Sequence, residues 1–248
     1  MKALHALVFV AACGGSGSNG DSAVDGSTDN VDAKVFMDAP PVVPQSIALS
    51  GVAAERSLSG ETAVEGVTMA AFASSAETTQ LASATTDAAG MYTITVMTTG
   101  APLDGFIKAT KSGYLDVYMY PASPFITDST DASVNMMTAT NRDFLSNLAS
   151  GNQMAGKGLI GLQIRDAAGN PVTGATVSST PASPAYRYTG SNGLPSGSAT
   201  STSADGVAFM FNMPAGPITI SATKSGKTFK SHIVLARADK FTTTSITE

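Results

Sequence analysis

The sequence predicts an all-β protein in which two tandem β-sandwich domains are joined by a short helix and preceded by a disordered linker. Three observations predict this class: short β-branched segments between Gly, Pro and Asp-Gly turns, alternation of apolar and polar residues, and an internal repeat. The 248 residues are enough for two domains of ordinary size. In chain order, the expected segments are residues 1–12, 13–44, 45–137, 138–155 and 156–248.

The chain begins with a short apolar segment that leads to its single cysteine. Lys2 precedes an apolar run over residues 3–12, which is far shorter than the ~20 residues that span a bilayer. A positive charge followed by such a run is typical of a secretory signal peptide. The Val-Ala-Ala-Cys motif that ends at Cys13 resembles the lipobox of bacterial lipoproteins. This resemblance implies a signal peptide over 1–12, lipidation of Cys13, and export to a lipid-anchored position in the cell envelope, the outer membrane being favoured over the inner.

Residues 13–44 are expected to form a flexible acidic linker. Gly, Ser and Asp dominate the segment, so ordering it would cost more conformational entropy than its few apolar groups could recover. Four of its aspartates, Asp21, Asp25, Asp29 and Asp32, recur at intervals of three or four residues. Their spacing differs from that of a calcium-binding loop, and mutual repulsion along a solvated tether accounts for them.

Three short motifs recur in the same order in the two parts of the chain. The first copies occupy residues 64–69, 85–92 and 109–113, and the second copies occupy residues 172–177, 201–208 and 222–226. The last motif, Ala-Thr-Lys-Ser-Gly, is identical in both copies. Such a repeat predicts two copies of one domain, at 45–137 and 156–248.

Alternation within the repeated segments predicts strands with one buried face. In the first copy the inward side chains are expected to be those of Tyr92, Ile94 and Val96. In the second copy they are expected to be those of Val207, Phe209 and Phe211, with the other face largely polar. Half-buried strands joined by tight turns predict two packed sheets in each domain.

The motifs resemble those of the carboxypeptidase regulatory-like domain, a transthyretin/Ig-like β-sandwich. In the first copy the similarity is carried by residues 86–92 and by Lys111-Ser112-Gly113-Tyr114. In the second it is carried by residues 171–177, Asp205-Gly206, residues 214–216 and Lys224-Ser225-Gly226. The second copy departs from the pattern at Lys227, where an aromatic residue usually follows the glycine, and in a Ser/Gly-rich insertion near 181–201. The resemblance implies a fold and an accessory or binding role, and it is poor evidence for any particular function.

One helix is expected between the domains, at about 141–150 within the connector 138–155. Thr140 and Asp143 have the spacing of a capping box, and Gly151 is a natural stop. The helix is expected to pack between or against the sandwiches through Phe144, Leu145 and Leu148.

The composition excludes much chemistry. A net charge of −5 argues against nucleic acid as a partner. The two histidines are His5 and His232, so after cleavage one histidine would remain, too few for a zinc site or a typical Ser-His pair. No catalytic residue, metal or cofactor is therefore expected, although a hydrolase using two carboxylates stays open.

One segment is predicted as a possible binding surface. As a strand, residues 114–120 would place Tyr114, Asp116, Tyr118 and Tyr120 on one face. A tyrosine combines apolar area with a hydroxyl group, which suits a contact surface. The alternative is that these tyrosines cover a sheet or pack on the helix. The function expected from the whole sequence is that of a non-catalytic cell-envelope lipoprotein, a binding or structural module for polysaccharide or an envelope protein. The alternative is an accessory subunit that positions a partner enzyme.

Overall fold

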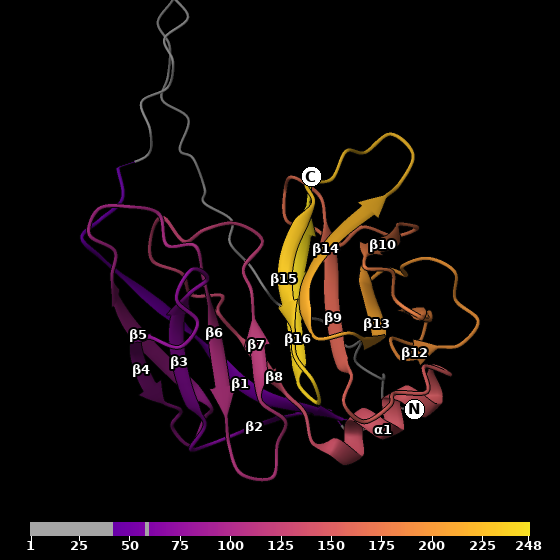
Figure 1. Cartoon of the computed structure of the whole chain (residues 1–248), viewed down its shortest axis with the longest axis horizontal. Helices are drawn as coiled ribbons and strands as arrows, with labels where there is room; N and C mark the ends of the chain where they lie inside the picture. The colour runs from indigo at the N-terminus through magenta and orange to yellow at the C-terminus, as the bar shows by residue number, and fades with distance from the viewer. Residues whose placement is uncertain (1–41, 58–59) are drawn as a thin grey trace, which may run out of the picture.

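The computed structural model describes residues 42–57 and 60–248 (Figure 1). The predicted signal peptide, Cys13 and nearly all of the predicted linker lie outside these residues. Within the described part of the chain, no helix is both long and apolar enough to cross a membrane.

Strands precede and follow one helix, and we call the two parts the first and second halves. The first half contains β1 (Ser46–Ser57), β2 (Gly60–Ala63), β3 (Thr68–Ala73), β4 (Gln80–Thr85), β5 (Met91–Met97), β6 (Gly105–Thr110), β7 (Val117–Met119) and β8 (Val134–Met136). The helix is α1 (Ala139–Leu148). The second half contains β9 (Gly158–Arg165), β10 (Thr176–Thr180), β11 (Ala185–Thr189), β12 (Pro195–Ser196), β13 (Val207–Met213), β14 (Gly216–Thr223), β15 (His232–Ala236) and β16 (Phe241–Thr247).

The strands form three sheets, one of which passes through both halves. This nine-stranded sheet has the order β12-β11-β13-β9-β16-β7-β6-β3-β4. A sheet of β1, β2, β5 and β8 covers one face of it in the first half, and the sheet β10-β14-β15 covers the other face in the second half (Figure 1). The predicted all-β class with two packed sheets in each half is confirmed.

The two halves are joined by a parallel strand pair in the middle of the long sheet. Phe241 and Thr243 of β16 lie opposite Val117 and Met119 of β7. The backbone N–H of Tyr120 also donates to the carbonyl of Thr243, at 2.9 Å. The tandem sandwiches therefore share backbone hydrogen bonds instead of being linked by the connector alone.

The internal repeat is visible as the same hydrogen bonds in both halves. The hydroxyl of Thr86 donates to the carbonyl of Val64 and accepts from the N–H of Val67. Thr202 makes the same two contacts in the second half. A glycine with positive φ follows in each copy, Gly90 at 72° and Gly206 at 67°. A Cβ at either position would also lie about 2.5 Å from a backbone oxygen of the neighbouring strand, so there is no room for a larger residue.

The alternation predicted for the two copies is confirmed for β5 and wrong for β13. In β5, Tyr92, Ile94 and Val96 are buried and the residues between them are exposed. Every residue of β13 is buried, because sheet β10-β14-β15 covers one face of this strand and α1 with the segment after it covers the other. Phe211 on the second of these faces packs directly against Gly151.

The helix begins two residues earlier than predicted. Its N-cap is Thr138, whose hydroxyl accepts from the N–H of Asn141 at 3.1 Å, so the predicted capping box at Thr140 is wrong. Phe144 and Leu148 are 43% and 40% exposed, so the predicted packing face is also wrong for these two residues.

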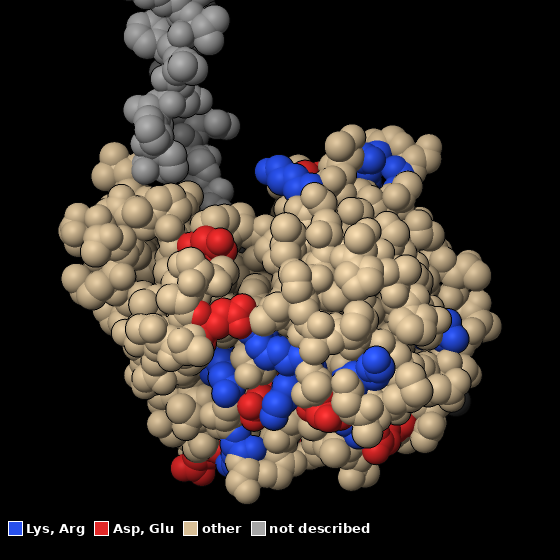
Figure 2. All heavy atoms as spheres, viewed as in Figure 1, with Lys and Arg blue, Asp and Glu red and all other residues tan. Residues whose placement is uncertain are grey.

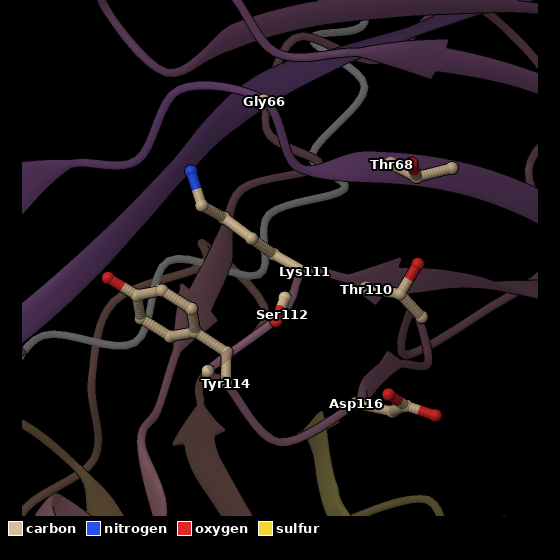
Figure 3. Close-up of a pocket in the computed structure, with 8 residues that line it drawn as sticks. Gly66, Thr68, Thr110, Lys111, Ser112, Tyr114 and Asp116 are labelled. Carbon is tan, nitrogen blue, oxygen red and sulfur yellow. The ribbon is translucent and has the colours of Figure 1, made fainter.

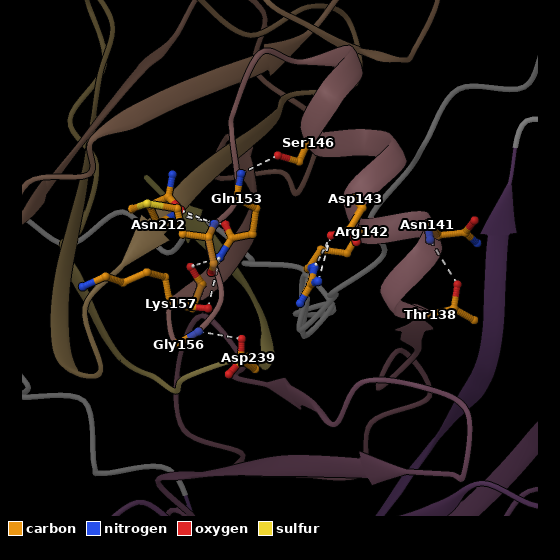
Figure 4. A network of polar contacts seen from close by, with 12 residues as sticks. Thr138, Asn141, Arg142, Asp143, Ser146, Gln153, Gly156, Lys157, Asn212 and Asp239 are labelled. Atoms are coloured by element: carbon orange, nitrogen blue, oxygen red, sulfur yellow. Dashed lines mark hydrogen bonds and ion pairs between the residues drawn. The ribbon is translucent and has the colours of Figure 1, made fainter.

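The connector is held mainly by the second half. Arg187 donates to the carbonyls of Ala149 and Ser150, where a cation stabilises the C-terminal end of a helix. Beyond the helix, the amide of Asn212 bonds the backbone of residues 151–154, and Gln153 donates to the carbonyl of Lys157 (Figure 4). The helix and the loop after it thus form a cover for β13 rather than a free linker.

Candidate functional site

A shallow pocket of about 670 Å³ lies in the first half, where the turn between β6 and β7 meets the start of β3 (Figure 3). We call it the β6–β7 pocket. Its described lining consists of Gly66, Thr68, Thr110, Lys111, Ser112, Gly113, Tyr114 and Asp116. Two of the four residues predicted as a binding surface, Tyr114 and Asp116, are therefore part of it.

The pocket is shaped by a β-turn from the repeated motif. The N–H of Tyr114 donates to the carbonyl of Lys111 at 3.1 Å, and Gly113 has a φ of 87°. A turn with a left-handed third residue favours glycine at that position. Thr68 of β3 and Thr110 of β6 face each other directly across the strand pair, so their side chains lie on the same face of the sheet.

Tyr114 is held in a defined orientation. Its O–H donates to a carboxylate oxygen of Glu55 at 2.9 Å, and the Nδ2 of Asn141 donates to the other oxygen of Glu55 at 2.5 Å. Burial and the hydrogen bond to Glu55 raise the pKa of Tyr114 above its ordinary value. The half-buried ring is thus preorganised as a wall of the pocket.

The charged groups of the pocket already have partners. The carboxylate of Asp116 lies 3.5 Å from the Nζ of Lys108 and 3.2 Å from the Nζ of Lys240. The ammonium of Lys111 donates to the carbonyl of Glu65. Acidic and basic side chains are intermixed on the face of the molecule that Figure 2 shows. The pocket therefore offers hydroxyl groups and an aromatic ring, together with an ammonium that is held by a neutral carbonyl and a carboxylate that is held between two lysines.

The other two predicted residues are not on a surface. Tyr118 is 8% exposed and Tyr120 is 4% exposed, so the prediction that they line an exposed row is wrong. The guanidinium of Arg237, from the second half, lies 3.8 Å from the centre of the Tyr118 ring. It also donates to the hydroxyl of Tyr120 at 3.1 Å and to the carboxylate of Glu77 at 2.8 Å. These tyrosines do form a contact surface, but its partner is the second half of the same chain and not α1.

The two threonines, Lys111 and Ser112 are not among the site residues that the sequence predicted. The Lys-Ser-Gly motif was informative about the fold because it is repeated. Nothing local in the sequence shows that Thr68 lies beside Thr110, since their pairing joins two strands that are distant along the chain.

Other chemistry finds little support among the described residues. In this part of the chain, no group of three or more His, Cys, Asp or Glu side chains is arranged to hold a metal ion. His232 lies on β15, and burial lowers its pKa, an effect partly opposed by the charge of Asp104.

No family model and no curated protein matches the sequence. Solved structures with some similarity include GBS52, the minor pilin of Streptococcus agalactiae, at 12% identity and a TM-score of 0.27, over 82% of this chain and 96% of that one. The shaft pilin SpaA of Lactobacillus rhamnosus GG matches at 11% identity and a TM-score of 0.24, over 82% and 96%. The Bacillus anthracis TIE protein matches at 13% identity and a TM-score of 0.25, over 80% of this chain and 33% of that one.

Proposed function

We propose that the chain is a non-catalytic binding module of the bacterial cell envelope that contacts polysaccharide through the β6–β7 pocket. The observation that carries the proposal is the lining of this pocket. Thr68 and Thr110 border the pocket from one side of the turn and the oriented ring of Tyr114 borders it from the other, with Ser112 in the turn itself (Figure 3), so the lining includes four hydroxyl groups and one aromatic ring.

This lining suits a neutral, hydroxyl-rich ligand. Sugar hydroxyl groups both donate and accept hydrogen bonds, as do the serine, threonine and tyrosine hydroxyl groups of the pocket. The ring of Tyr114 adds an apolar surface on which the face of a sugar can rest. The open shape of the pocket favours a chain that passes over it rather than a small molecule enclosed within it.

The pocket does not favour the hydrolase alternative. A glycosidase of the usual type needs two carboxyl groups that flank the bond to be cleaved. Among the described residues that line the pocket, Asp116 is the one carboxylate, and two lysines already pair with it.

A protein contact is the second candidate, and one observation favours it. Phe144 and Leu148 lie on the same side of α1 and are both partly exposed, an arrangement found at protein interfaces. An accessory subunit that positions a partner enzyme would use such a helix.

The binding proposal is tested by replacing Tyr114. With dextran as the neutral glucan probe, Tyr114→Ser is expected to weaken binding about thirtyfold, the order of a hot-spot truncation. Tyr114→Phe keeps the ring and is the matched control, which is expected to retain most of the affinity. Equal affinities of the wild-type protein and Tyr114→Ser, measured by affinity gel electrophoresis, would contradict the proposed site.

The envelope location is tested separately, through the lipid anchor proposed at Cys13. Two or more acyl chains give stable membrane attachment, and the cysteine alone would carry them. Cys13→Ala is therefore expected to move the protein from the detergent phase to the aqueous phase while the domains stay folded. Equal partitioning of the variant and the wild-type protein would refute the anchor.

A further inference from the structure

We infer that the second half carries a second polysaccharide site, built on the repeated turn and selective for sugars that bear a carboxylate. The inference rests on the proposed function of the β6–β7 pocket. The counterparts of Gly66, Thr68, Thr110, Lys111, Ser112, Gly113 and Tyr114 in the repeat are Gly174, Thr176, Thr223, Lys224, Ser225, Gly226 and Lys227. Six of these seven positions hold the same residue in both halves.

The backbone of the second site repeats that of the first. The N–H of Lys227 donates to the carbonyl of Lys224 at 3.1 Å, the same turn hydrogen bond at the same length as in the first half. Gly226 has a φ of 75°, close to the 87° of Gly113. The turn therefore presents its side chains in the same directions.

The hydroxyl groups are also placed alike. Thr176 of β10 lies directly opposite Thr223 of β14, as Thr68 lies opposite Thr110. Thr176, Thr223 and Ser225 are all exposed. A sugar chain can reach all three hydroxyl groups from solvent.

The two sites differ at the residue after the glycine and at the position of Asp116, where the second half has Phe229. Both side chains reach a glutamate: Tyr114 donates to Glu55, and the ammonium of Lys227 lies 2.6 Å from a carboxylate oxygen of Glu248. The second site thus replaces an aromatic wall with a positive charge. A lysine ammonium binds a carboxylate as a point charge, so an acidic sugar is the ligand that this change favours.

Glu248 competes with such a ligand for Lys227. The side chains of Lys227 and Glu248 are 27% and 20% exposed, and Glu248 also accepts from the N–H of Ala167 at 3.3 Å. A ligand carboxylate can take the place of Glu248 on Lys227 while Glu248 is hydrated. Removing the charge of Glu248 should therefore improve the site.

The test uses the full chain with two probes, dextran as a neutral glucan and polygalacturonate as an acidic one, at low ionic strength. Lys227→Gln is expected to weaken polygalacturonate binding about tenfold, and Glu248→Gln to strengthen it several-fold. Neither change is expected to affect dextran. Lys230→Gln removes an exposed charge from the same loop and is the matched control.

The outcomes separate this inference from the proposed function. Equal losses in Lys227→Gln and Lys230→Gln would show that polygalacturonate responds to overall charge only, and would overturn the second site. Absence of polygalacturonate binding, or an unchanged affinity in Lys227→Gln, would also overturn it. An unchanged dextran affinity in Tyr114→Ser would instead reject the first site. The polygalacturonate affinity of Lys227→Gln would still test the second site, because it does not depend on the dextran result.

Discussion

Arg237 is expected to be the strongest single side-chain link between the two halves. Its side chain is 17% exposed and bonds Glu77 and Tyr120 of the first half while its guanidinium covers the ring of Tyr118. In Arg237→Met the packing volume is largely kept and these polar contacts are lost. A hydrogen bond to a charged group contributes about 1.5–3 kcal/mol and a cation–π contact about 0.5–2 kcal/mol.

The Glu77 contact has to be discounted, because the carboxylate is 34% exposed and can be hydrated once the arginine is gone. We therefore expect Arg237→Met to lower the free energy of unfolding by about 2–5 kcal/mol, from the remaining hydrogen bond and cation–π contact. Urea denaturation followed by circular dichroism measures this change. The control is Arg142→Met, which breaks an ion pair with Asp143 within α1 and, like Arg237, removes an arginine side chain that is 17% exposed.

The control pair lies closer to solvent, since Asp143 is 56% exposed, and we expect its loss to cost about 1 kcal/mol or less. Adding Glu77→Gln to Arg237→Met should change stability little further, because the two residues act through one contact. The reasoning is refuted if Arg237→Met costs no more than Arg142→Met. It is also refuted if Glu77→Gln has the same effect with and without Arg237.

Three further predictions concern the repeat, the connector and pH. Gly206→Ala is expected to lower the free energy of unfolding by about 3 kcal/mol, because the new Cβ clashes with a backbone oxygen and the position has a left-handed φ. Gly174→Ala is the control: it has a left-handed φ but open space around it, and its cost, measured by urea denaturation, should be about 1–2 kcal/mol. Similar costs for the two variants would contradict the close approach of the strands at Gly206. A fragment of residues 156–248 is expected to fold and to give a dispersed amide NMR spectrum. A longer fragment that includes the helical connector, which covers Phe211, is expected to be more stable. Equal melting temperatures of the two fragments would contradict a stabilising role for the connector. Burial lowers the pKa of His232 below the unfolded value of about 6.5, so protonation favours unfolding, and stability should fall as the pH drops below about 6.5. His232→Gln should reduce that fall in melting temperature between pH 7.5 and 5, and an unchanged pH profile would contradict the assignment.

The sequence predicted the features that depend on local chemistry. Period-two alternation identified the buried face of β5, and the repeated Lys-Ser-Gly turns identified two copies of one fold. These signals are local because a turn needs a residue that tolerates its φ, and a half-buried strand needs one apolar face.

The errors arose where distant segments decide which surface is covered. Alternation places Tyr118 on the face opposite to Val117, but it does not say that Arg237 will cover that face. In the same way, β13 has apolar residues on both faces because a sheet packs on one side and α1 on the other. The helix start was misplaced by two residues because Thr138 and Thr140 are both capable N-caps, and the chain path decided between them.

The join between β7 and β16 has a consequence for how the protein is made. The edge of β7 can be paired only after nearly the whole second half has been synthesised, because β16 follows all the other strands in the chain. Pairings between strands so far apart in sequence form slowly, since a long loop must close first. If the chain is exported from its N-terminus as proposed, the first half waits outside the membrane with an open sheet edge, and such edges favour aggregation. A chaperone that shields β7 during this interval would raise the yield of folded protein.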